Sequence, residues 1–99
     1  MVVDFEDNNL QRLFEEPEFR LPRLGSDLTR AFRKVVGIVR AAADERDLYS
    51  MQSLHFERLE GDRAGQRSLR LNRQWRLVVR LETVQAVKRV VVIEIINYH

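Results

Sequence analysis

The sequence of 99 residues contains no cysteine. This absence excludes disulfides, thiolate metal sites, iron–sulfur clusters and cysteine nucleophiles, and it makes a reducing cytoplasm the expected location. Long apolar runs are also missing, because the longest, Val90–Ile93, is far below the roughly 20 residues of a membrane span. The first nine residues include Asp4, Glu6 and Asp7 and lack the basic start and the apolar stretch of a secretory signal. We therefore expect a protein that is neither exported nor embedded in a membrane.

Glycine and proline are scarce, with four and two copies, while 44% of the residues are hydrophobic and 32% are charged. Such a composition is typical of a folded chain and argues against a disordered or fibrous one. The length suits one domain, and we find no repeat, low-complexity stretch or linker. We therefore expect residues 1–99 to form a single domain.

Lysine is nearly absent, since only two of the 17 basic residues are lysines and the others are arginines. Residues 1–50 hold ten acidic and eight basic side chains, whereas residues 51–99 hold five acidic and nine basic ones. The planar guanidinium group suits bidentate contact with phosphate or carboxylate, so the basic half suggests an anionic partner. Genome bias and a solvated surface are the alternative explanation.

The N-terminal half predicts a short strand and two helices. Met1–Phe5 is the strand, and Asn8 or Asn9 is expected to cap a helix that runs to about Glu16, before Pro17.

The second predicted helix begins after Ser26 as its N-cap and runs to about Asp44. Its apolar residues recur at intervals of three and four, as an amphipathic helix requires: Leu28, Phe32, Val35, Val36, Val39 and Ala43. Residues 47–53 are expected to form a loop.

The C-terminal half predicts three strands, because the apolar period changes to two. Leu69 and Leu71 belong to the first strand and Trp75 to Leu81 to the second, with Asn72–Gln74 as a hairpin turn between them. Residues 83–88 are expected to form another connection. The third predicted strand, Arg89–Tyr98, is expected to point Val91, Ile93 and Ile95 to one face.

Together these elements predict an α+β fold, with helices on one face of a mainly antiparallel sheet and the other face open. Alternation along the strands puts these residues on the open face: Arg70, Arg76, Arg80, Val92, Glu94, Ile96 and Tyr98. Three crowded arginines repel one another unless an anion or an acidic group relieves them, and Glu94 is an internal candidate. The open face is therefore expected to bind nucleic acid or an acidic protein.

Four stretches carry a family resemblance: Leu10–Phe14, Leu59–Gln66, Ser68–Arg76 and Glu94–His99. They resemble a Leu-Lys-Gly-Asp-Arg-x-Gly segment, a Ser-Ile-Arg-Ile-Asn-x-Gln-Trp-Arg hairpin and a chain end in Asp-Tyr-His, in the same order and with the same spacing over residues 8–99. These are features of the HigB toxins of the RelE/ParE superfamily. The resemblance implies a RelE/ParE-like fold, with N-terminal helices packed on one face of a small sheet.

The resemblance also implies a function. HigB toxins belong to bacterial type II toxin–antitoxin systems, and the well-understood members are ribosome-dependent endoribonucleases that cut mRNA in the decoding site. The implied partners are a HigA-like helix-turn-helix antitoxin and the ribosome with its mRNA. No organic cofactor is implied.

Metal-free RNA cleavage needs a base for the 2′-hydroxyl, an acid for the leaving 5′-oxygen and cations for the phosphate charge. The chain has two histidines, His55 and His99, whose ordinary pKa permits either role. Through the resemblance, His99 is expected to act as acid or base, Tyr98 to stack on a base or assist proton transfer, and Arg76 to stabilise phosphate. Asn97 occupies the catalytic end motif, but its amide cannot exchange a proton as the usual Asp does.

Other side chains are candidates for positioning RNA through its backbone without reading its sequence: Arg63, Arg70, Arg80, Arg58 and His55. Glu60 stands where the family often has Lys. Glu60 and Asn97 motivate an alternative, a RelE/ParE-fold toxin with weakened catalysis that acts by binding protein, for example as a gyrase inhibitor. A metal enzyme is not expected, since two histidines 44 positions apart and no cysteine make no ligand cluster.

Overall fold

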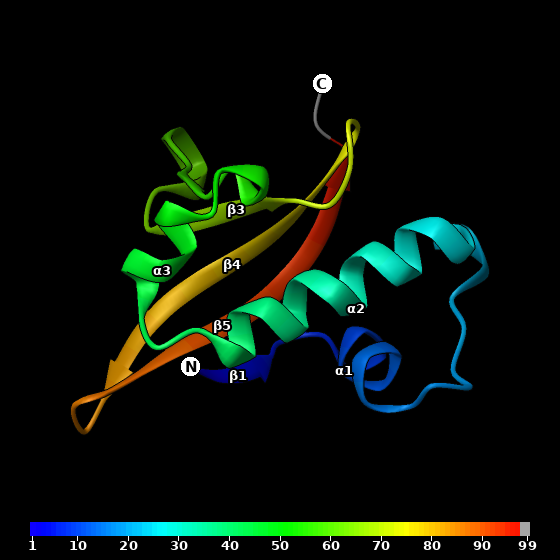
Figure 1. Cartoon of the computed structure of the whole chain (residues 1–99), viewed down its shortest axis with the longest axis horizontal. Helices are drawn as coiled ribbons and strands as arrows, with labels where there is room; N and C mark the ends of the chain where they lie inside the picture. The colour runs from blue at the N-terminus through cyan, green and yellow to red at the C-terminus, as the bar shows by residue number, and fades with distance from the viewer. Residues whose placement is uncertain (98–99) are drawn as a thin grey trace.

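The structure is a computed structural model that describes residues 1–97 (Figure 1). Its elements are β1 (Val2–Phe5), α1 (Asn8–Glu15), η1 (Pro22–Leu24), α2 (Gly25–Ala41), α3 (Glu45–Ser50), η2 (Gln52–Leu54), β2 (Glu57–Arg58), η3 (Gly61–Arg63), β3 (Gln66–Arg70), β4 (Trp75–Val84) and β5 (Val87–Asn97). The five strands form one sheet in the order β1-β5-β4-β3-β2. Only β1 and β5 pair in parallel within the described chain, so the predicted α+β fold with a mainly antiparallel sheet is confirmed.

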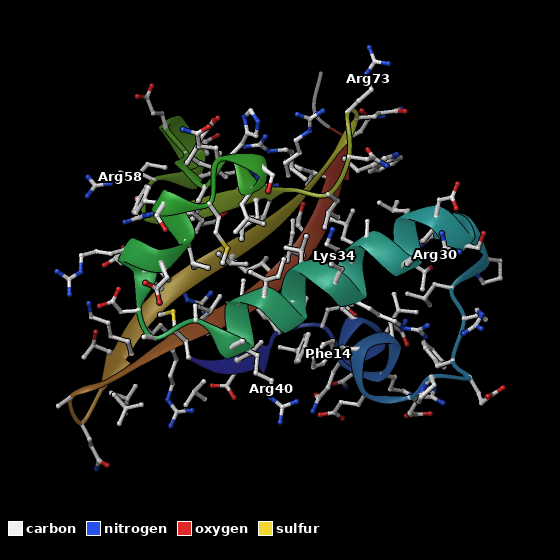
Figure 2. The ribbon with its side chains drawn as sticks, in the orientation of Figure 1. Phe14, Arg30, Lys34, Arg40, Arg58 and Arg73 are labelled. Atoms are coloured by element: carbon white, nitrogen blue, oxygen red, sulfur yellow. The ribbon has the colours of Figure 1, made fainter. Side chains whose placement is uncertain are left out.

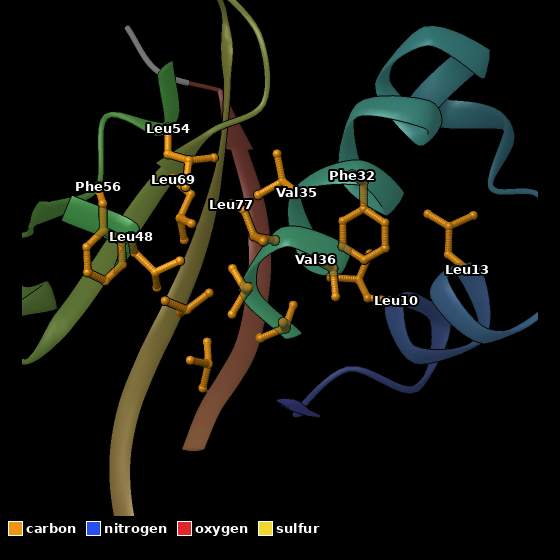
Figure 3. Close-up of a cluster of buried hydrophobic side chains, with 14 of the residues drawn as sticks. Leu10, Leu13, Phe32, Val35, Val36, Leu48, Leu54, Phe56, Leu69 and Leu77 are labelled. Atoms are coloured by element: carbon orange, nitrogen blue, oxygen red, sulfur yellow. The ribbon is translucent and has the colours of Figure 1, made fainter. Parts of the chain in front are cut away.

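The core lies between the sheet and the helices α1, α2 and α3 (Figure 3). Phe32 of α2, Leu13 of α1 and Leu48 of α3 are fully buried, and they belong to the same cluster as Leu69 and Leu77 of the sheet. Burial of each large apolar side chain contributes about 1.5–3 kcal/mol to stability, so this layer fixes the helices against one face. None of the helices in residues 1–97 is long and apolar enough to cross a membrane.

The N-terminal caps of α1 and α2 differ from the predicted ones. Asp7, and neither Asn8 nor Asn9, caps α1, because its Oδ1 accepts a hydrogen bond of 3.0 Å from the amide of Leu10. Ser26 lies inside α2, since the 3-10 turn η1 leads directly into Gly25 and no side chain caps that end. An acidic or polar residue near a helix start therefore marks the region but not the cap position.

The region expected to be a loop, residues 47–53, instead contains most of α3 and the start of η2. α2 ends at Ala41, and Asp44, which we expected to end that helix, caps α3 by accepting a hydrogen bond of 2.9 Å from the amide of Arg46. α3 has six residues and a single buried one, Leu48. So short a helix carries too little periodicity to be recognised.

The hairpin between β3 and β4 is confirmed. Oδ1 of Asn72 accepts hydrogen bonds from the amides of Gln74 (2.8 Å) and Trp75 (2.9 Å), which closes the turn. The predicted connection over residues 83–88 is wrong, because β4 and β5 remain paired as far as Val84 and Val87. Only Gln85 and Ala86 form that turn, both with positive φ. A two-residue turn of this kind usually has Asn or Gly, and because Gln85 and Ala86 are neither, this turn could not be predicted.

A β-bulge divides the pairing of β4 with β5. Val78 pairs with Glu94, but the next residue, Val79, pairs with Val92, so Ile93 is the extra residue. Such an insertion moves the side chains beyond it to the opposite face of the sheet.

The bulge overturns part of the predicted facing of the last strand. Ile95 faces the core and Glu94 and Ile96 face away from it, as expected. Beyond the bulge, however, Val92 lies in the core cluster instead of on the open face, and Val91 takes the opposite side. Only a paired structure reveals this change, because the run of valine and isoleucine has no polar residue to mark the parity.

Candidate functional site

The candidate site lies on the sheet face away from the helices, where β3, β4 and β5 meet. Arg76 of β4 lies opposite Arg70 of β3 on one side and Ile96 of β5 on the other. The segment 55–57 approaches from the edge formed by β2. We call the group His55, Glu57, Ser68, Arg70 and Arg76 the Arg76 cluster.

Arg76 is the buried centre of this cluster, with 5% of its surface exposed. Its Nε and Nη2 donate to Oγ of Ser68 at 3.3 and 3.0 Å, and Nη2 also donates to the carbonyl oxygen of His55 at 2.8 Å. Oε1 of Glu57 lies 3.6 Å from Nη2 and supplies a negative charge. A guanidinium tolerates burial only with such partners. Arg76 points to the predicted face of the sheet. Its guanidinium is not exposed there, however, because it is buried against Ser68, His55 and Glu57.

His55 places an exposed imidazole beside this buried charge. It ends η2 with φ 45°, a left-handed conformation that is unfavourable for a residue with a Cβ. The hydrogen bond from Arg76 to its carbonyl oxygen holds that conformation in place. Its Nε2 lies 3.4 Å from Nη1 of Arg70. The fold therefore brings His55, Arg70 and Arg76 together, as a phosphate site requires.

Arg63 covers part of the same face. Its Nη2 pairs with Oε1 of Glu94 at 2.9 Å, and its Nη1 donates to Oε1 of Gln66 at 3.1 Å. Because β4 lies between β3 and β5, this side chain crosses β4 beside Val78, which is fully buried. Glu94 was expected to relieve the three crowded arginines, but its ion-pair partner within residues 1–97 is Arg63 instead.

Arg80 is engaged by acidic side chains some way from the cluster. Its Nη1 contacts Oε2 of Glu6 at 2.8 Å and its Nε contacts Oε2 of Glu82 at 2.7 Å. These two hydrogen bonds raise the pKa of the Arg80 guanidinium, and the one to Glu6 has the larger effect. Arg70, in contrast, contacts no carboxylate within residues 1–97 and donates only to His55 and to the carbonyl oxygen of Asn72. Of the predicted RNA contacts on this face, Arg70 is the one whose charge is not neutralised.

Arg58 and Asn97 take no part in the contacts described above. Arg58 lies opposite Arg67 in the backbone pairing of β2 with β3. Its side chain is exposed and extends away from the sheet (Figure 2). Asn97 is the last described residue; it lies opposite Trp75, which packs against the core as predicted. The two most important candidates, Tyr98 and His99, lie outside the described residues.

Sequence reasoning missed Ser68 and Glu57, which hold Arg76. Ser68 is fully buried, and Glu57 is half-exposed at the sheet edge. The only signal for Ser68 was its place two residues before Arg70 in the hairpin motif. For Glu57 there was none, since β2 has only two residues and its pairing with Ser68 was not predictable.

Two comparisons with known proteins identify one family, and a third shows a shared fold. A family model described as "RelE-like toxin of type II toxin-antitoxin system HigB" matches residues 3–99. Toxin HigB-1 of Vibrio cholerae serotype O1 is 33% identical over 78 residues, which cover 79% of this chain and 81% of that toxin. A solved YoeB/ParE toxin from Agrobacterium tumefaciens superposes over 100% of both chains with a TM-score of 0.60 and 19% identity, which shows the shared fold.

Proposed function

Because the chain belongs to the HigB-like toxins of type II toxin–antitoxin systems, we propose that it is a ribosome-dependent endoribonuclease that cleaves mRNA and inhibits translation. The observation that carries this proposal is the Arg76 cluster, in which the buried Arg76 guanidinium donates to the backbone of His55, while the exposed His55 imidazole lies 3.4 Å from Arg70, an arginine with no carboxylate partner in the described chain. The family implies an antitoxin partner. We propose that this antitoxin is HigA-like and that the toxin acts on cytoplasmic ribosomes carrying mRNA.

In the proposed reaction a base removes the proton of the 2′-hydroxyl, and the 2′-oxygen attacks phosphorus to form a 2′,3′-cyclic phosphate. The bond to the 5′-oxygen breaks, and an acid supplies the proton that this oxygen needs. His55 and His99 are the two imidazoles in the chain, and we assign them these two roles. Asn97 lies in β5, one residue beyond the partner of Arg76, and the sequence continues directly into Tyr98 and His99.

The cations have different tasks in this proposal. We assign contact with the scissile phosphate to Arg70, and two observations support this: its guanidinium is 3.4 Å from the His55 ring, and it forms no ion pair in residues 1–97. Arg76 adds positive charge near this position and fixes the backbone of His55. Tyr98 stacks on a base. Arg63 and Arg80, which are paired with carboxylates, contribute less to RNA binding.

The test is a reconstituted translation reaction with one defined mRNA, in which the 5′ ends of the products are mapped. His55→Asn and His99→Ala should each lower the cleavage rate by about 100-fold or more, the usual loss for an acid or base. Gln52→Ala, an exposed change in the same 3-10 turn as His55, should leave the rate unchanged. Circular dichroism checks that all variants fold.

Intact message in the presence of the toxin and ribosomes would refute the proposal. Growth arrest on expression without message cleavage would favour a toxin that acts by binding protein. Unchanged rates in both histidine variants would refute the assignment of the acid and the base.

A further inference from the structure

A second group of arginines surrounds a small pocket at the start of α2, apart from the Arg76 cluster. The pocket has a volume of about 240 Å³ and is lined by Arg20, Ser26, Thr29, Arg30 and Arg33. It lies where the connector from α1 enters α2, at the end of the molecule opposite the β4–β5 turn, and Arg30 marks the place (Figures 1 and 2).

Two of these arginines converge on the same backbone oxygens. Nη1 of Arg20 donates to the carbonyl oxygens of Pro17 and Phe19 at 2.6 and 3.0 Å. Nη2 of Arg33 donates to the same two oxygens at 3.3 and 3.1 Å. The two nitrogens therefore cannot be farther apart than the sum of two hydrogen-bond lengths. The fold holds two like charges close together.

Little negative charge compensates this pair. Neither Arg20 nor Arg33 forms an ion pair within the described chain, and their partners are neutral carbonyl groups. Arg30 contacts Asp27 at 3.5 Å, but both side chains are almost fully in solvent, so this pair is weak. Glu18 is exposed in the connector and pairs with neither arginine. Three guanidinium groups thus border one pocket with one weakly held carboxylate.

The arginines keep hydrogen-bond donors for a ligand. Nη2 of Arg20 and Nη1 of Arg33 donate to no group in residues 1–97. A phosphate group accepts several charge-assisted hydrogen bonds from such donors. The lining includes no aromatic side chain on which a base could stack, and the pocket is open to solvent. These features favour contact with a nucleic-acid backbone over capture of a free nucleotide.

We propose that this pocket binds one phosphate group of an RNA backbone and so anchors RNA at a point separate from the cleavage site. The choice of RNA as ligand rests on the proposed function, whereas the anion site rests on the arginines themselves. The pocket has no imidazole, so it positions RNA and takes no part in proton transfer.

The experiment measures binding of a 2′-O-methyl oligoribonucleotide, which cannot be cleaved, by fluorescence anisotropy over a series of salt concentrations. The test variant is Arg20→Gln with Arg30→Gln, which leaves Arg33 to support α1. The matched control is Arg40→Gln with Arg46→Gln, since Arg40 is likewise not ion-paired in the described chain and Arg46 is likewise an exposed arginine paired with an aspartate, Asp44. Circular dichroism checks the fold.

We expect the test variant to bind up to about fivefold more weakly for each arginine removed. The slope of log affinity against log salt should become shallower by about 0.7, the value for one phosphate of a single strand. The control should keep the wild-type slope. Equal losses in the two variants would overturn the proposal, because they would reflect net charge alone.

A second arm separates RNA from a free anion. Inorganic phosphate is titrated while NMR follows the Nε–H signals of the arginines. Shifts confined to Arg20, Arg30 and Arg33, together with an unchanged RNA slope in the test variant, would identify a small-anion site and overturn the RNA proposal. Because no cleavage is measured, a toxin without nuclease activity still gives a clear result for this pocket.

Discussion

Replacement of Ser68 by Ala tests how the Arg76 cluster is held together. The serine hydroxyl accepts hydrogen bonds from Nε and Nη2 of Arg76 at 3.3 and 3.0 Å, and both side chains are buried. Alanine fills nearly the same space but offers no acceptor, and water has little access to the donors that remain. The change therefore removes hydrogen bonds and leaves packing almost unaltered.

The expected loss follows from the charge and burial of the donor. A hydrogen bond to a charged group contributes about 1.5–3 kcal/mol, and a buried donor that loses its partner falls in the same range. With a urea dependence of about 1.5 kcal/mol/M, typical of small proteins, the unfolding midpoint should drop by about 1–2 M. Arg76 keeps its bond to the carbonyl of His55, so the protein should still fold.

The assay is urea unfolding followed by circular dichroism, combined with the mRNA cleavage reaction. Ser53→Ala is the control, because it removes the same hydroxyl at an exposed position of η2. Ser68→Ala should lower the cleavage rate under conditions in which it is fully folded, since a loosened Arg76 no longer fixes His55. A free energy of unfolding within about 0.5 kcal/mol of wild type would show that Ser68 does not hold Arg76.

Two further predictions concern exposed charges. Arg70→Gln should weaken binding of uncleavable RNA more than Arg80→Gln, because Arg80 is already paired with Glu6 and Glu82; equal losses in a binding titration would contradict this reasoning. Two hydrogen bonds from Arg46 hold the pKa of Asp44 below its ordinary value of 3.8. The bond from the Arg46 side chain has the larger effect, and the bond from its backbone amide has the smaller one. Since the folded-state pKa is the lower one, this stabilisation is present above about pH 4 and is lost as the pH falls through the lowered pKa. Asp44→Asn should therefore make unfolding stability less dependent on pH below pH 4, and an unchanged acid limb in urea titrations would exclude this contribution.

Periodicity predicted the elements that are long or closed by a clear turn. α2 is recognisable because its apolar residues follow the helical period, and the β3–β4 hairpin because Asn72 separates two alternating strands. α3 and the β4–β5 turn were missed, since a helix of six residues and a turn of Gln85 and Ala86 lack the usual signals. Local sequence therefore predicts an element where its own preference agrees with the tertiary structure. It does not predict an element whose conformation is set by strand pairing alone.

For the candidate site, the alternation of residues along the strands predicted which face of the sheet each side chain takes, but not how deeply the side chain is buried. Arg70 and Arg76 share the expected face, yet one keeps a donor for ligand and the other is buried on Ser68 and His55. Burial depends on which distant segment folds over the face, and Arg63 reaches across it from η3. The two residues of the terminal motif, Tyr98 and His99, remain predictions from the resemblance.

The parallel pairing of β1 with β5 has a consequence for biosynthesis. β5 separates β1 from the other strands, so β1 joins the sheet only through β5, which is translated after β1 to β4. An incomplete chain on its way out of the ribosome leaves both β1 and β4 with an empty edge. These two edges are therefore closed only once β5 has been released, whereas β2, β3 and β4 can pair before it.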